Sequence, residues 1–123
     1  MATLEVGARN AACNAIVDLV DAGAGAGTLV FETSGDVEVA TLTFSDPAFG
    51  GSASGVATAS AITSDSSATG GTVAQASIFD SNALKVLEAT VSTAAADINL
   101  SSLTIGAGDT VSISSLTATM PAS

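Results

Sequence analysis

The chain has 123 residues, a length typical of one domain, and carries 12 acidic residues against two basic ones for a formal net charge of −10. This charge argues against nucleic acid and anionic membrane surfaces as direct partners, because phosphate groups bind clustered lysines and arginines. With no histidine and one cysteine, the chain also lacks the commonest general base, zinc ligands and thiol nucleophiles, so we expect no enzyme activity and no cofactor or metal.

The N-terminal part of the chain has helical periodicity. Residues 8–22 predict a helix whose apolar residues recur at three- and four-residue spacing on one face: Ala12, Cys13, Ile16, Leu19 and Val20. Alternating glycines and alanines at 23–27 end this helix. We therefore divide the chain into an N-terminal segment, 1–27, with the helix and a Gly/Ala linker, and a β-sandwich domain, 28–123. The first residues lack a basic segment followed by an apolar stretch, so no signal peptide is expected.

From residue 28 the periodicity changes to two, which is typical of strands. Leu29 shares a face with Phe31 in the first predicted strand, and Leu42 shares a face with Phe44 in the second. Strands are predicted at 28–33, 37–45, 55–63, 73–79, 85–93, 98–100, 103–105 and 110–120. About seven or eight short strands separated by turn signals predict a mainly β fold, an antiparallel β-sandwich or jelly roll with one N-terminal α-helix.

Two local features refine this prediction. The alternation of the last strand slips by one residue at Ser114 and Ser115, which predicts a β-bulge or a strand that switches sheets, and Pro121 ends the strand. A single cysteine excludes an internal disulfide. Cys13 is therefore free, and it is expected to be a small buried hydrophobe on the helix.

Aspartates recur in the predicted loops and at strand ends: Asp46, Asp65, Asp80, Asp97 and Asp109. Aspartate in such positions usually accepts hydrogen bonds from nearby backbone amides and stabilises a turn. Carboxylates are also calcium ligands, but the spacing matches no EF-hand or repeated calcium motif. Whether a surface cluster of these residues binds calcium is left open by the sequence.

Several blocks of the sequence resemble a group of small virion proteins encoded by tailed bacteriophages. The resemblance covers most of the chain from about residue 8 and is carried by Gly27–Thr28–Leu29, Ala40–Gly50, Ile62–Ser67 and Thr110–Pro121. It implies a β-sandwich or jelly-roll fold and a structural role in the virion, after synthesis in the host cytoplasm. The implied partners are the major capsid protein or other virion subunits. The segment 72–90 fits the resemblance least well.

Three functions are consistent with these features. The first is a capsid decoration or cement protein, and the second is a tail, baseplate or fibre-associated protein. The third is a surface adhesin or carbohydrate-binding module, against which the absence of Trp and Tyr counts. A homo-oligomer, a dimer or trimer, is expected because short strand edges gain by being covered and such symmetry matches lattice axes.

The residues that contact a partner are expected in the N-terminal segment and in two loops, since loops on a rigid sandwich usually carry recognition. The candidates are Arg9, Asp46, Pro47, Phe49 and Asp65. Pro47 and Phe49 are the candidate anchors, although the Phe49 ring is equally suited to fold back over one end of the core.

Overall fold

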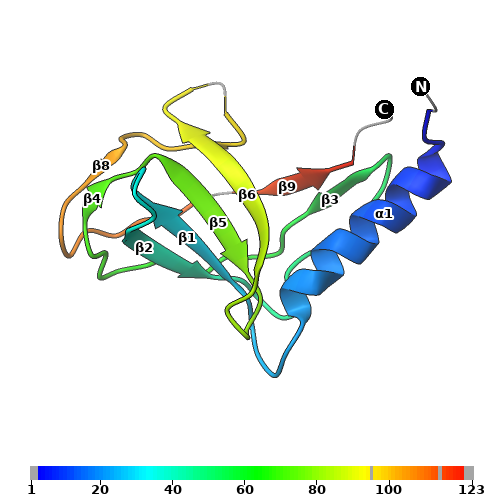
Figure 1. Ribbon diagram of the computed structural model, residues 1–123, viewed down its shortest axis with the longest axis horizontal. Coiled ribbons are helices and arrows are strands. Elements are labelled where there is room, and N and C mark those ends of the chain that lie inside the picture. The colour runs from blue at the N-terminus through cyan, green and yellow to red at the C-terminus, as the bar shows by residue number, and fades with distance from the viewer. Residues whose placement is uncertain (1–2, 95, 114, 121–123) are drawn as a thin grey trace.

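The computed structural model describes residues 3–94, 96–113 and 115–120, which form one helix and nine strands (Figure 1). Helix α1 spans Val6–Asp18 and continues into the 3₁₀ turn η1, Leu19–Asp21. The strands are β1 Thr28–Glu32, β2 Glu38–Thr43, β3 Val56–Thr58, β4 Gly71–Thr72, β5 Gln75–Phe79, β6 Lys85–Ser92, β7 Ile98–Asn99, β8 Thr104–Ile105 and β9 Thr117–Thr119. Strands hold 36% of the residues and helix 14%, so the predicted mainly β class with one N-terminal helix is confirmed.

The strands form one curled five-stranded sheet and two small ribbons. The order in the sheet is β2-β1-β5-β6-β7, and the ribbons pair β3 with β9 and β4 with β8. Every pair is antiparallel except β6 with β7, where Val91 lies opposite Ile98 in a parallel pair. The sheet is therefore mixed rather than purely antiparallel. Strand β7 has only two residues, which pair with the last two residues of β6.

The core face of the sheet follows the predicted alternation. Phe31 lies opposite Ala40 on β2 and Ala76 on β5, so two small side chains flank the large ring. This alternation of large and small side chains lets the layers pack closely, as native cores require. The residues predicted to face inward in the first two strands are all buried: Leu29, Phe31, Leu42 and Phe44.

Helix α1 packs against the β3–β9 ribbon, and these elements project together from one end of the sheet, as Figure 1 shows. We call α1, β3 and β9 the arm. The Cys13 thiol donates a 3.4 Å hydrogen bond to the carbonyl of Ala118 on β9, which joins helix and ribbon. At 2% exposure, Cys13 is the buried side chain that the sequence predicts. The helix and turn η1 bury three side chains: Cys13, Val17 and Val20.

One part of the predicted helix face is wrong. Leu19 was expected to be buried, but its side chain is 55% exposed, and Val17 occupies the inward position instead. Leu19 begins the 3₁₀ turn η1. Cys13, Val17 and Val20 fall within one narrow arc at about 100° for each residue. Leu19 lies roughly 120° away from this arc, so ordinary helical geometry already turns it outward once that face is buried.

The last predicted strand is shorter than the sequence suggests. Only Thr117–Thr119 pairs as a strand, while Val111 forms a single antiparallel bridge with Asp65. The two bridge residues exchange backbone hydrogen bonds of 2.7 and 3.0 Å. Ser114 and Pro121, which carry part of the predicted bulge and the predicted strand end, lie outside the described residues.

Candidate functional site

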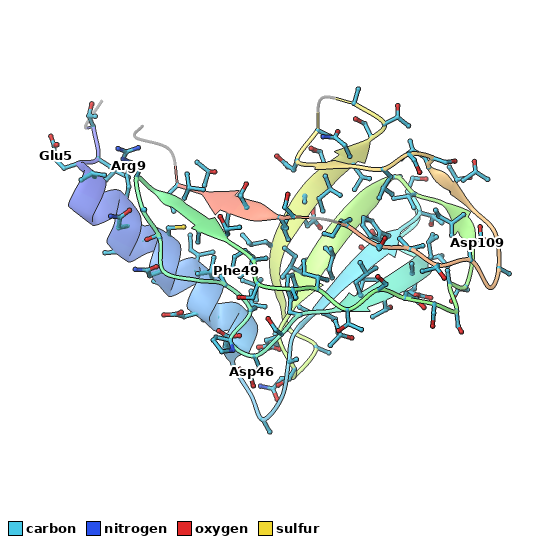
Figure 2. The ribbon with its side chains drawn as sticks, turned by 180° about the vertical axis from the view of Figure 1, so that it is seen from behind. Glu5, Arg9, Asp46, Phe49 and Asp109 are labelled. Carbon is cyan, nitrogen blue, oxygen red and sulfur yellow. The ribbon has the colours of Figure 1, made fainter. Side chains whose placement is uncertain are left out.

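Arg9 lies on α1 at the outer end of the arm (Figure 2). It is half-buried beside Gly55, whose φ of +77° belongs to the left-handed region that favours glycine. A Cβ atom at Gly55 would approach the Arg9 Cβ to 3.3 Å. The Arg9 Nε is buried and has no hydrogen-bond partner among the described residues. Arg9 is therefore built into the end of the arm more closely than a free surface arginine.

Asp46 and Pro47 lie in the exposed loop that follows β2, at the vertex between arm and sheet in Figure 2. The peptide bond between them is cis. The next residue, Ala48, is buried, and its N–H donates a 2.8 Å hydrogen bond to the Asp21 carboxylate at the end of η1. This contact anchors one side of the loop to the arm and leaves Asp46 and Pro47 accessible.

Phe49 folds back into the core, one of the two placements that the sequence allowed. Its side chain is 7% exposed, and its ring centroid lies 5.7 Å from that of Phe44 at an interplanar angle of 37°. Tilted pairs at this separation are a favourable aromatic geometry. The ring therefore contributes to packing between arm and sheet, and its face is not presented as an exposed anchor.

Asp65 lies beside β2. One carboxylate oxygen accepts a hydrogen bond from the Thr41 N–H at 2.9 Å, and the other accepts one from the Ser67 N–H at 2.9 Å. Both oxygens are thus used to hold the loop 64–71 against the sheet. The predicted contact residues do not converge on one site, because Arg9, the Asp46 loop and Asp65 occupy three separate places.

Three other loop aspartates, Asp80, Asp97 and Asp109, also bind backbone amides as predicted, whereas the Asp46 carboxylate accepts no hydrogen bond from the described residues. Asp80 accepts hydrogen bonds from the N–H groups of Asn82 and Leu84, and Asp109 accepts one from Gly106. In the described part of the chain, no group of three or more acidic, cysteine or histidine side chains is arranged to hold a metal ion.

A pocket of about 210 Å³ opens between the arm and the sheet. Its walls come from α1, β6 and β9, and we call it the groove. Most of its lining is aliphatic or aromatic, and its two charged residues are Glu88 and Asp97. Sequence reasoning missed the groove because its walls come from segments far apart in the chain. Apolar side chains in the lining include Ile16, Phe49, Leu87, Leu116 and Met120.

Two strand edges without strand partners among the described residues border the groove. On β6, the Thr90 N–H donates to the Asp97 carboxylate at 3.0 Å, on the side away from β5. Because hydrogen-bonding direction alternates along a strand, Glu88 presents its N–H and C=O to that same side. No described strand pairs with β6 there, since β7 reaches only Val91 and Ser92.

The other open edge belongs to β9. The Met120 N–H and the Leu116 carbonyl both bond to the β3 side, at 2.7 and 2.8 Å. The alternation therefore directs the N–H and C=O groups of Thr117 and Thr119 to the opposite side, where they line the groove. Unpaired backbone groups of this kind are templates for an added strand.

Part of the apolar face of α1 forms one wall of the groove. Ile16 lines the groove and is only half-buried, whereas the neighbouring Val17 is buried against the arm and sheet. The helix thus has an apolar face broader than the surface that covers it. Part of the face predicted to be buried, including Ile16, remains accessible to another molecule.

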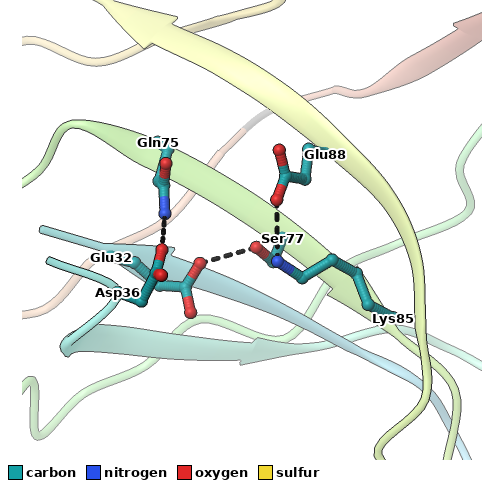
Figure 3. Close-up of polar contacts among 6 residues, drawn as sticks. All are labelled: Glu32, Asp36, Gln75, Ser77, Lys85 and Glu88. Carbon is teal, nitrogen blue, oxygen red and sulfur yellow. Dashed lines mark hydrogen bonds and ion pairs between the residues drawn. The ribbon is translucent and has the colours of Figure 1, made fainter. Parts of the chain in front are cut away.

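The outer face of the sheet is polar (Figure 3). Ser77 is completely buried, and its hydroxyl donates a 2.6 Å hydrogen bond to the Glu32 carboxylate. Lys85 donates to Glu88 at 2.7 Å, and Gln75 donates to Asp36. Because Ser77 is buried, its hydroxyl is not accessible to a substrate. Its hydrogen bond to Glu32 joins β5 to β1 and stabilises the sheet.

Lys85 interacts with several of these carboxylates. The hydrogen bond to Glu88 raises the pKa of Lys85 above 10.5, and the negative charges of Glu88, Glu32 and Asp36 act in the same direction. Both side chains of the ion pair are well exposed, at 40% for Lys85 and 59% for Glu88. The ion pair therefore lies on the solvent-exposed surface of β6, beside the open edge of this strand.

The groove with its two strand edges is the arrangement best suited to bind another molecule, and that molecule would be an extended polypeptide. Among the described residues, no helix has the length and apolarity needed to cross a membrane. Comparisons with protein-family models, curated proteins and solved structures gave no match.

Proposed function

We propose that the chain is a structural protein of a tailed-bacteriophage virion, which binds the assembled capsid as a cement protein and stabilises it through protein–protein contacts. The observation that carries this proposal is the groove, because its apolar lining lies beside two strand edges whose backbone groups have no strand partner among the described residues. Binding another protein over such surfaces lowers the free energy, because it buries the apolar lining and pairs the open backbone groups.

The resemblance to small virion proteins gives this binding a context. The blocks that carry it include Ala40–Gly50, which contains most of the loop at the vertex between arm and sheet. Its exposed residues, Asp46 and Pro47, stay candidates for contact with a capsid subunit. Phe49 lines the groove and follows Pro47 by two residues in the chain, so a partner seated in the groove lies close to this loop.

Charge and size also suit a cement protein. A net charge of −10 on 123 residues keeps free subunits soluble and apart until they meet a complementary surface. Many copies on one lattice then multiply a modest affinity at each site, so no single contact has to be strong.

The first test is the number of copies in virions of the phage whose genome encodes this chain. We expect quantitative mass spectrometry of purified particles to find hundreds of copies, in a fixed ratio to the major capsid protein. A value between six and a few dozen would place the protein in the tail instead. Its absence from purified particles would refute a structural role in the virion.

The second test measures stabilisation of the shell. Particles assembled without the protein should release their DNA at a lower temperature than wild-type particles, and addition of purified protein should restore the difference. Bovine serum albumin at the same concentration serves as the control for non-specific protein. Equal release temperatures with and without the protein would contradict the cement role.

A further inference from the structure

We propose that the groove receives an extended, positively charged segment of a partner protein, which adds as a strand to the open edge of β6. This inference deepens the proposed function, on which it rests for the existence of a protein partner. Three properties of the groove support this binding mode: its backbone groups, its apolar walls and its charge.

The backbone groups define where the segment binds. The Asp97 carboxylate already accepts a hydrogen bond from the Thr90 N–H. Two residues before Thr90, the edge of β6 presents the N–H and C=O of Glu88 to the groove. The register with β5 shifts at Val86, because Phe79 pairs with Lys85, so the alternation holds only from Leu87 onward. From Leu87 to Thr90 the edge spans about 10 Å, at about 3.3 Å for each residue. It can therefore pair with a segment of about three or four residues.

The walls define which side chains the segment carries. Leu87 and Ala89 lie opposite Ile78 and Ala76 on the core side of the sheet, so this side of β6 is apolar where it meets the groove. Side chains of an added strand on that side would meet Ile16 as well. They are expected to be small or aliphatic, because a pocket of about 210 Å³ has room for only a few such groups.

The charge defines the other face of the segment and excludes a second copy of this chain as the occupant. Glu88 and Asp97 are the charged residues of the lining, and the chain as a whole has 12 acidic residues against two basic ones. A second copy would bring a net charge of −10 to an equally acidic protein. Lysine or arginine in the bound segment would instead be attracted by Asp97 and by Glu88, whose exposed ion pair with Lys85 it would share.

The test uses a displayed library of random peptides about 12 residues long, selected against the full chain. We expect the enriched peptides to alternate aliphatic and basic residues and to lack proline in the paired stretch, since proline cannot complete the ladder. The amide signal of Glu88 should shift when a selected peptide is added in solution, and that amide should become protected from hydrogen exchange. Enrichment of acidic peptides, or none, would overturn the proposal.

Matched variants then separate the three properties. Glu88→Pro removes an edge N–H that makes no bond to β5, while Glu88→Gln removes only the negative charge. We expect Glu88→Pro to weaken a selected basic peptide by about tenfold more than Glu88→Gln does, which corresponds to about one hydrogen bond. Equal effects of the two changes would show that the edge does not pair with the peptide.

The apolar wall is tested by Ile16→Asp, with Val37→Asp as its control. Val37 is 61% exposed and precedes β2, at the opposite edge of the sheet from β6. Ile16→Asp should abolish peptide binding, and Val37→Asp should leave it unchanged. Circular dichroism of both variants tests whether they fold. Should Ile16→Asp unfold the chain, Ile16→Ser gives the same comparison, and peptide binding undiminished by the serine variant would count against the apolar wall.

The outcomes keep this inference distinct from the proposed function. A protein that is abundant in virions but attaches normally with Glu88→Pro would retain the function and lose the strand-addition site. A protein absent from virions that still selects basic peptides at β6 would do the reverse. Concentration-dependent dimers that Glu88→Pro converts to monomers would identify a second copy as the occupant, against the proposal.

Discussion

Asn10 on α1 accepts a 2.8 Å hydrogen bond from the N–H of Gly55, just before β3. Two more bonds join the same elements, because Ser52 donates its N–H to Asn14 at 2.9 Å and its hydroxyl to the Asn10 carbonyl at 2.9 Å. The polar residues of the helix thus hold the loop 50–55, while its apolar residues hold the ribbon. The arm is a single packed unit, and the helix is an integral part of it.

Asn10→Ala should therefore destabilise the chain. The substitution leaves the buried Gly55 N–H without its acceptor, which costs about 1–3 kcal/mol of unfolding free energy. Urea unfolding followed by circular dichroism measures the change. Asn82→Ala is the control, because Asn82 is exposed and its side chain makes no hydrogen bond to the described residues. Equal midpoints for the two variants would mean that this contact contributes little.

Strand positions and the core face of the sheet could be predicted because they depend on local periodicity. Leu29 and Phe31 lie two residues apart on one side of the strand, so a sheet that buries that face must bury both. The helix was harder, since its apolar residues span more than one face, and only packing against the ribbon shows that Val17 and not Leu19 is buried. The division into segments 1–27 and 28–123 stays a prediction, although α1 contacts both β3 and β9.

The groove could not be predicted from the sequence. Ile16, Leu87 and Met120 meet there only because the arm projects beside β6, and that placement depends on contacts such as Asp21 with Ala48. The open edges are equally a property of the sheet order, since β6 loses its outer partner where β7 ends. A sequence can suggest that strand edges exist, but pairing decides which of them stay open.

Gly27 is expected to tolerate no side chain. A Cβ atom there would lie 2.5 Å from the Phe79 carbonyl oxygen and 2.7 Å from a methyl group of Val20, so backbone or helix must shift. Gly27→Ala should lower the unfolding free energy by about 1–3 kcal/mol, as overpacking does. Gly51→Ala is the matched control, because a Cβ at Gly51 meets no atom within 4 Å. Thermal melts of the two variants provide the comparison, and a stable Gly27→Ala protein would contradict the close approach.

Phe49→Ala distinguishes a core ring from a partner anchor. Because Phe49 is 7% exposed and packs against Phe44, its truncation should cost about 3–5 kcal/mol of unfolding free energy. Leu84→Ala should change the unfolding free energy by about 0.5 kcal/mol or less, because Leu84 is 64% exposed. Guanidinium unfolding measures both. A Phe49→Ala protein of normal stability that fails to bind capsids would instead identify the ring as an anchor.

Lys85 provides a test of the polar outer face through pH. Its pKa lies above 10.5 because Glu88 accepts its hydrogen bond, so the folded chain holds this proton more tightly than the unfolded chain does. The resulting stabilisation is complete below pH 10.5 and is lost as the pH rises through the folded pKa. NMR titration of the lysine side chain should give a pKa that falls in Glu88→Gln and stays unchanged in Glu5→Gln, at the far end of the arm. An identical pKa in wild type and Glu88→Gln would exclude Glu88 as the main cause.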